Sequence, residues 1–188
     1  MTWLTDFWRS SIGGKVAVPH LVPYTTSKFA LAGLSDGMRS ELAKDGISVT
    51  TVFPGLMRTG SHFNAMFKGQ HGKEFTWFSI IDALPVSSVD AQTAARQIVE
   101  ATRKGAPQLV ISFQAKALAA LQAMFPHAMS GALKAMNWFL PAPTNDFSGD
   151  FNRTGWESQT PLAPSVLSQL ADQATEDNNG MHGQTAVS

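Results

Sequence analysis

Apolar residues recur at helical spacing between residues 24 and 45, in a segment that follows Pro23 and ends just before Gly46. Proline is frequent in the first turn of a helix and glycine just beyond its end, so this pattern predicts one long helix. The apolar stripe consists of Ala30, Leu31, Leu34, Met38 and Leu42. Two glycines, at positions 33 and 37, interrupt that stripe and weaken it.

Two short segments rich in β-branched and apolar residues predict buried strands, at residues 47–53 and 108–113. A second helix is predicted between them at residues 88–104, because its apolar residues share one face and a capping-box-like start precedes it. The order helix, strand, helix, strand is typical of a parallel α/β sheet. We therefore expect the two strands to be parallel and adjacent, as the later part of a larger α/β domain.

The remaining segments show weaker patterns. Residues 59–86 have no clean period and contain many aromatic side chains. Residues 115–140 predict a very apolar helical region that a proline interrupts near its middle. Beyond the prolines at 141 and 143 the chain becomes polar, so we expect one domain over residues 1–143 and a largely disordered tail over residues 144–188.

Composition argues against several classes of protein. The formal net charge is zero, from 14 basic and 14 acidic residues, so we expect no nucleic-acid partner. The chain has no cysteine and its histidines are far apart, so we expect neither disulfides nor a metal site. Residues 1–10 carry no basic leader, so we expect no signal peptide and a cytoplasmic location.

Membrane association is also disfavoured by the sequence. The most apolar stretch, residues 115–140, is broken by polar residues, so we expect no membrane-spanning helix. A helix that lies in a membrane surface usually has a basic polar face. Lys116 and Lys134 are few for that purpose, so a peripheral membrane role is the less favoured interpretation.

Three residues near the start of the chain carry candidate chemistry. Tyr24 and Lys28 are four positions apart, so a helix places them on the same face. An ammonium group nearby favours the phenolate form of a tyrosine, which can then exchange a proton near neutral pH. Ser11 lies thirteen residues before Tyr24, on a predicted loop that can return to the same site. By spacing alone, a half-buried tyrosine beside a solvated lysine is the commoner explanation.

The surrounding residues change that balance. The segments SSIGG and YTTSKFALAGLSDGMRSELAKDGISVTTVFPGLMRTG resemble the classical short-chain dehydrogenase/reductase (SDR) family, and the likeness extends over residues 10 to about 140. It implies a doubly wound, Rossmann-like fold and hydride exchange between NAD or NADP and a small-molecule carbonyl or alcohol substrate. It also implies that Tyr24 donates or accepts the proton, that Lys28 favours the phenolate and binds the nicotinamide ribose, and that Ser11 orients the substrate.

The resemblance implies further sites for the cofactor and substrate. The family's strand-ending Pro-Gly motif and the threonine after it correspond to Pro54, Gly55 and Thr59, and with Met57 these would meet the nicotinamide. Residues 59–86 correspond to the substrate loop. Their apolar side chains would suit an apolar or bulky substrate, although simple packing is equally consistent; they are Phe63, Met66, Phe67, Phe75, Trp77 and Phe78. The helix at 24–45 often contacts a partner subunit in this family, which implies a homo-oligomer.

The resemblance also identifies what this sequence lacks. No G-x-x-x-G-x-G motif for the cofactor's pyrophosphate occurs anywhere in the 188 residues, and the residue that distinguishes NAD from NADP is absent too. We therefore expect residues 1–143 to form a truncated Rossmann-like domain without its cofactor-binding half. Residues 1–9 show no strand pattern of the family type, although the segment TWLTDFW could take the missing strand's place.

Two consequences are expected from this truncation. The strand at residues 47–53 should lose its inner neighbour and leave an exposed edge. The chain alone should bind NAD or NADP too weakly for useful turnover. Two functions therefore remain open: an oxidoreductase, or a non-catalytic fragment that serves as a subunit-interaction module.

Overall fold

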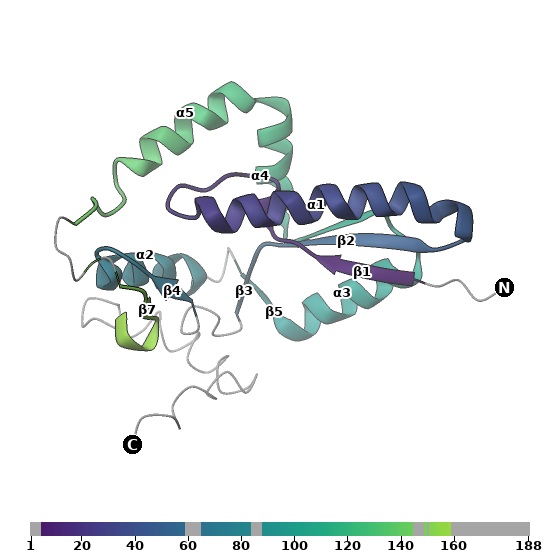
Figure 1. Ribbon diagram of the computed structural model, residues 1–188, viewed down its shortest axis with the longest axis horizontal. Helices are drawn as coiled ribbons and strands as arrows, with labels where there is room; N and C mark the ends of the chain where they lie inside the picture. Colours follow the sequence, from purple (N-terminus) through teal and green to yellow (C-terminus); the bar gives the residue numbers. More distant parts are fainter. Residues whose placement is uncertain (1–4, 59–64, 84–87, 145–148, 150, 159–188) are drawn as a thin grey trace, which may run out of the picture. The chain divides into compact units, whose positions relative to one another are not determined.

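The computed structural model describes residues 5–58, 65–83, 88–144, 149 and 151–158, and Figure 1 shows their arrangement. The chain divides into two compact units. The first contains Met1–Gly55 and Ala91–Trp138, and the second contains Leu56–Asp90 and Phe139–Ser188. The predicted boundary between residues 143 and 144 stays a prediction.

The first unit is built on a parallel three-stranded sheet. Its strands are β1 (Thr5–Arg9), β2 (Ser48–Pro54) and β6 (Gln108–Ile111), in the order β1-β2-β6. Strand β2 pairs with β6 from Thr51 opposite Gln108 to Pro54 opposite Ile111. The prediction of two parallel, adjacent strands is therefore confirmed. The fold class, a mixed α/β arrangement of Rossmann-like type, is confirmed with it.

Strand β1 corrects the expectation that β2 has no inner neighbour. Thr5 to Arg9 pair in parallel with Ser48 to Val52, so β2 is the central strand of this sheet. The segment had no clear strand pattern because most of its side chains are exposed, which leaves no alternation of buried and exposed positions. Phe7 and Trp8 favour extended structure, and the backbone pairing to β2 completes the strand.

Two helices cover the sheet. Helix α1 (Val22–Leu42) and helix α3 (Ala91–Arg103) lie on opposite sides of it in Figure 1. Every residue of β2 from Val49 to Pro54 is buried. Because successive side chains of a strand point to opposite faces, this pattern requires cover on both faces of the sheet.

Polar contacts fix helix α1 to the sheet, beside the partly buried Leu31, Met38 and Leu42 of its apolar stripe. Its buried residues are Thr25 and Ser35, whereas Leu34 is exposed. The Ser35 and Thr51 hydroxyl groups share a hydrogen bond of 2.6 Å. Arg39 donates from Nε to the Val49 carbonyl oxygen at 2.8 Å and from Nη2 to Thr51 Oγ1 at 2.5 Å. These bonds satisfy groups that would otherwise be buried without partners.

The predicted apolar helical region forms two helices, α4 (Phe113–Met124) and α5 (Pro126–Asn137). The break falls at Pro126, as expected, because proline lacks the amide that would continue α4. Ser112 caps α4 from its N-terminal end by accepting a hydrogen bond from the Ala115 amide at 3.2 Å.

The second unit is small and aromatic. Strands β3 (Leu56–Arg58) and β5 (Ser88–Asp90) pair in parallel, and β4 (Met66–Phe67) pairs antiparallel with β7 (Arg153–Thr154). The sequence predicted helix from residue 88, but the helix begins at Ala91, because β5 precedes it. Helix α2 (His71–Ala83) was not predicted, because apolar residues occur on all its sides.

The described residues contain neither a membrane-spanning helix nor a metal-binding cluster. Among them, no helix is long and apolar enough to cross a membrane. The same residues contain no group of three or more histidine, aspartate or glutamate side chains arranged to hold a metal ion.

Candidate active site

The candidate site begins where β1 ends. The Ser10 amide donates to the Val52 carbonyl oxygen at 2.8 Å, which carries the β1–β2 pairing one residue further. The side chain of Ser10 is buried, and its Oγ donates to the Lys28 carbonyl oxygen at 2.9 Å. The end of β1 is thereby joined to the backbone of α1 at the turn that carries Lys28.

The loop after β1 fits against α1 because of a glycine. Residues Ile12–Gly14 form one turn of 3-10 helix. A Cβ atom placed on Gly14 would lie 2.5 Å from Ser10 Oγ and 2.8 Å from the Lys28 carbonyl oxygen. Both distances are shorter than real contacts, so any side chain at this position would push the loop away from the helix.

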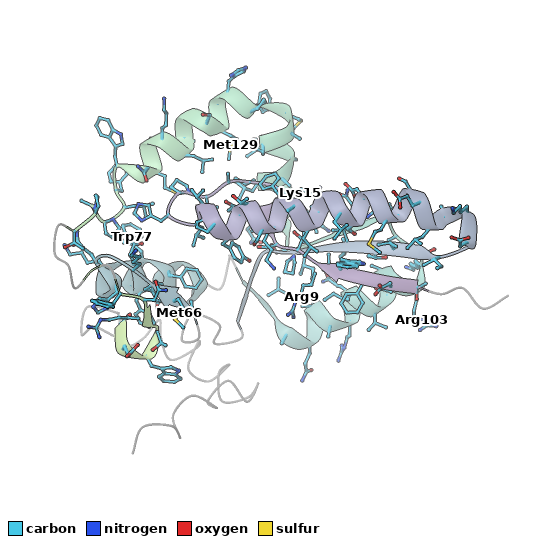
Figure 2. The ribbon with its side chains drawn as sticks, in the orientation of Figure 1. Arg9, Lys15, Met66, Trp77, Arg103 and Met129 are labelled. Atoms are coloured by element: carbon cyan, nitrogen blue, oxygen red, sulfur yellow. The ribbon has the colours of Figure 1, made fainter. Side chains whose placement is uncertain are left out.

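Lys15, labelled in Figure 2, anchors the other end of this loop to the sheet. Its Nζ donates to Gln108 Oε1 on β6 at 2.8 Å and lies 4.2 Å from the centroid of the Phe53 ring on β2. The loop is therefore held both by α1 and by two strands.

Ser11 and Tyr24 both lie next to Gly13 in this loop. Ser11 Oγ accepts a hydrogen bond from the Gly13 amide at 3.2 Å. A Cβ atom placed on Gly13 would lie 3.0 Å from Cε1 of the Tyr24 ring. The loop thus brings Ser11 to the turn of α1 that carries Tyr24. Because Ser11 Oγ accepts from the loop, its own proton stays available for another acceptor.

Tyr24 and Lys28 lie on one face of α1. The Lys28 ammonium is 5.5 Å from the centroid of the Tyr24 ring, and the Tyr24 side chain is exposed. Within the described residues, the Tyr24 hydroxyl makes no hydrogen bond, and the Lys28 ammonium makes neither a hydrogen bond nor an ion pair. Both polar groups are therefore available to a ligand. The catalytic roles of these residues stay predictions.

The predicted nicotinamide contacts divide between the two units. Pro54 and Gly55 lie at the carboxyl end of β2, in the first unit. A Cβ atom on Gly55 would lie 2.9 Å from Ser112 Oγ, so this glycine is required by the packing of the protein itself. Met57 belongs to β3 in the second unit, and Thr59 lies outside the described residues.

The apolar residues of the predicted substrate loop differ in their burial. Phe67 and Phe75 are buried and form the core of the second unit, with ring centroids 5.6 Å apart. Phe78 packs against this core, and its ring centroid lies 6.0 Å from that of Phe67. Packing therefore accounts for these three aromatic residues. Met66 and Trp77 are exposed, and Phe63 lies outside the described residues.

No pattern in the sequence indicates that Ser10, Gly13 and Gly14 are parts of the site. The segment SSIGG carries all three, but their contribution depends on how closely the loop approaches α1. Spacing along the chain does not indicate that distance.

Comparisons with known proteins find sequences similar to part of this chain. A family model described as short chain dehydrogenase matches residues 9–66. The dehydrogenase/reductase SDR family protein 7-like of Anopheles gambiae is 31% identical over 105 residues, which are 55% of this chain and 31% of that protein. Dehydrogenase/reductase SDR family member 4 of Rattus norvegicus is 40% identical over 65 residues, which are 35% of this chain and 23% of that protein. The chain thus matches only about a third or less of each relative's length.

A solved structure shares the fold. A short-chain dehydrogenase from Burkholderia cenocepacia, determined in complex with NADP, superposes with a TM-score of 0.51 at 23% sequence identity. The superposition covers 68% of this chain and 46% of that one.

Proposed function

We propose that the chain belongs to the short-chain dehydrogenase/reductase family, whose model matches residues 9–66, and that it supplies the proton-transfer residues of an NAD(P)-dependent oxidoreductase. The reaction is the interconversion of an alcohol and a carbonyl compound. The observation that supports this most directly is the loop at residues 10–14, which holds Ser11 beside the turn of α1 that carries Tyr24. The matched region contains every residue assigned to the reaction.

The three side chains have separate roles in this proposal. The Tyr24 hydroxyl gives a proton to the substrate oxygen in reduction and takes it back in oxidation. The Lys28 ammonium lies on the same face of α1, 5.5 Å from the centroid of the Tyr24 ring, and its role is to bind the nicotinamide ribose. Ser11 accepts from the Gly13 amide and donates its own proton to the substrate oxygen, which fixes that oxygen near Tyr24.

The residues present suit the nicotinamide end of the cofactor. Bound NAD or NADP supplies or accepts the hydride. Within the described residues the Lys28 ammonium and the Tyr24 hydroxyl are unpaired and offer donors for a ribose. The Gly55 amide donates to the Ile111 carbonyl oxygen at 3.3 Å, and Ser112 fills the space beside its α-carbon. The 188 residues contain no motif for the pyrophosphate and no residue that selects NAD over NADP.

The proposed substrate is a small-molecule carbonyl compound or alcohol of apolar or bulky character. Of the aromatic and apolar residues in the substrate loop, Met66 and Trp77 are exposed and so remain available to contact a ligand. Phe67, Phe75 and Phe78 are occupied by packing in the second unit.

The test uses the product of the gene with any coding sequence upstream of the first codon included. We expect turnover of NADH or NADPH with apolar ketones or aldehydes, and a loss of about 10²-fold or more in Tyr24→Phe. Ser27→Ala removes a hydroxyl group from the same helix turn and serves as the matched control. Unchanged turnover in Tyr24→Phe would contradict the proposal.

A non-catalytic role as a subunit-interaction module is the second candidate. One face of α1 supports it, because Leu34 is exposed and nothing lies within 4 Å of a Cβ atom placed on Gly33 or Gly37. A homo-oligomer formed through this face should dissociate in Leu34→Glu, as sedimentation velocity would show. Oligomerisation combined with no turnover in any product of the gene would favour this candidate.

A further inference from the structure

Helices α4 and α5 of the first unit expose several large apolar side chains. Phe113 at the start of α4 is 80% exposed, and Trp138, directly after α5, is 89% exposed. Exposed apolar side chains also occur at the corner between the two helices and along them: Leu121, Met124, Phe125 and Met136. Large apolar patches on a protein surface usually mark an interaction site.

Helix α5 is covered very little by the rest of its unit. Of Pro126–Asn137, only Met129 and Leu133 are partly covered, and all other residues are exposed. Figure 2 labels Met129 on this helix. A groove of about 650 Å³ lies between one side of α5 and Pro19 and Phe29, and Lys134 and Trp138 are among the residues that line it. The opposite side of α5 carries no formal charge; it consists of His127, Ala128, Gly131, Ala132, Ala135 and Met136.

All charged side chains of helices α4 and α5 are lysines, so the formal charge of this pair of helices is positive. No aspartate or glutamate occurs between Glu100 and Asp146, whereas Lys116 lies on α4 and Lys134 on α5. Both lysines are exposed, and within the described residues neither forms a hydrogen bond or an ion pair. The α4–α5 hairpin therefore combines exposed aromatic residues with unpaired positive charge and no negative charge.

We propose that the α4–α5 hairpin binds the surface of a lipid bilayer that contains anionic lipids, with both helices parallel to the bilayer plane. Tryptophan and phenylalanine favour the boundary between headgroups and acyl chains, and lysines favour anionic headgroups. Each helix has 12 residues, too few to cross a hydrocarbon core that needs about 20. The sequence analysis disfavoured this role from the number of lysines alone, without the exposure of α5.

A second copy of the chain fits this surface less well. A symmetric dimer would place the same patch on both sides of the contact. Each copy would then bring the positive charges of Lys116 and Lys134 to the contact and no carboxylate of the hairpin to compensate for them. An anionic bilayer supplies the complementary charge that a second copy lacks.

The experiment is co-sedimentation of residues 1–188 with phosphatidylcholine vesicles prepared with and without phosphatidylglycerol. We expect binding to the vesicles that contain phosphatidylglycerol, weakened by added salt. Lys116→Gln/Lys134→Gln should lower the partition coefficient about 25-fold, from about fivefold for each lysine. Lys44→Gln/Lys73→Gln removes the same charge elsewhere and should leave binding unchanged.

A second pair of variants tests the apolar contribution. Phe125→Ser/Trp138→Ser should reduce binding about tenfold or more. Val22→Ser/Val99→Ser removes exposed apolar side chains outside the hairpin and should have no effect. Circular dichroism of each variant checks that the fold is retained.

Three results would overturn the proposal. They are no binding to either kind of vesicle, equal losses in both lysine variants, and binding that is equally strong without phosphatidylglycerol. Where no vesicle is bound, self-association that the hairpin variants abolish would identify a second copy of the chain as the occupant. Binding is measured without turnover, so its failure would leave the proposed reaction untouched.

Discussion

Gly13 and Gly14 are neighbours in the loop that carries Ser11, yet a side chain would meet different atoms at each. At Gly14 it would meet the backbone carbonyl oxygen of Lys28 at 2.8 Å, and at Gly13 the edge of the Tyr24 ring at 3.0 Å. A backbone inside a helix moves less easily than an exposed aromatic ring. The two glycines should therefore differ in how much they tolerate substitution.

We expect Gly14→Ala to lower the free energy of unfolding by about 1–3 kcal/mol, because the loop or the helix must shift to make room. Gly13→Ala should cost less, because the half-exposed Tyr24 ring can rotate away. Urea unfolding followed by circular dichroism measures both values. Equal losses in the two variants would contradict the described packing.

The residues of this site differ in whether the sequence could predict their role. Ser11, Tyr24 and Lys28 were identified because a motif preserves the spacing of side chains that act together. Ser10 and Gly14 support the site through contacts with the backbone of α1. Many spacings along the chain could produce such contacts, so they become visible only in the folded chain.

At the scale of elements, Gly33 and Gly37 lower the helix propensity of α1, and no packing contact in the first unit compensates for that loss. A Cβ atom on Gly33 or Gly37 would have nothing within 4 Å. Glycine in a helix is less favourable than alanine by about 0.5–1 kcal/mol. Gly46, which follows the 3-10 turn after α1, also has open space around it, but its φ of 71° lies in the left-handed region.

We expect Gly33→Ala/Gly37→Ala to raise the free energy of unfolding by about 1–2 kcal/mol, from the sum of the two helix propensities. Gly46→Ala should instead lower it by about 1–2 kcal/mol, because alanine is strained at positive φ. Thermal unfolding of the three proteins tests the two signs. A loss of stability in the α1 variant would indicate that the open face is already covered in solution.

Elements were predictable where burial imposes a pattern. Strand β2 was found because its residues are buried on both faces and are β-branched or apolar. Strand β1 and helix α2 lack such a pattern. Most side chains of β1 are exposed, so buried and exposed positions do not alternate, and apolar residues occur on every side of α2. Local pattern identifies an element only when one side of it differs from the other.

At the scale of the whole molecule, proton transfer and cofactor binding are separate tasks. The described residues hold Ser11, Tyr24 and Lys28 around one loop and one helix. The pyrophosphate of a nicotinamide cofactor normally binds at a glycine-rich turn, and these 188 residues contain no such motif.

We therefore expect purified residues 1–188 to show no useful turnover of NADH or NADPH with ketones or aldehydes. Correct placement of reactants is worth roughly 7–11 kcal/mol of barrier, and contacts at the nicotinamide end alone do not provide it. Nicotinamide absorbance measures the rate. Turnover that disappears in Tyr24→Phe would contradict this prediction and would imply that another chain provides the cofactor site.

The central position of β2 has a consequence for deuterium uptake. Its backbone pairs with β1 on one side and with β6 on the other, and Val49 to Pro54 are all buried. Amides in such a strand exchange with solvent only when the whole sheet opens, whereas those of a poorly covered helix exchange through local fraying. In D₂O, the amides of Val49–Phe53 should therefore retain their protons longest and those of α5 should lose them first. Mass spectrometry of peptic fragments would show this order, and equal rates in β2 and α5 would mean that the sheet does not persist in solution.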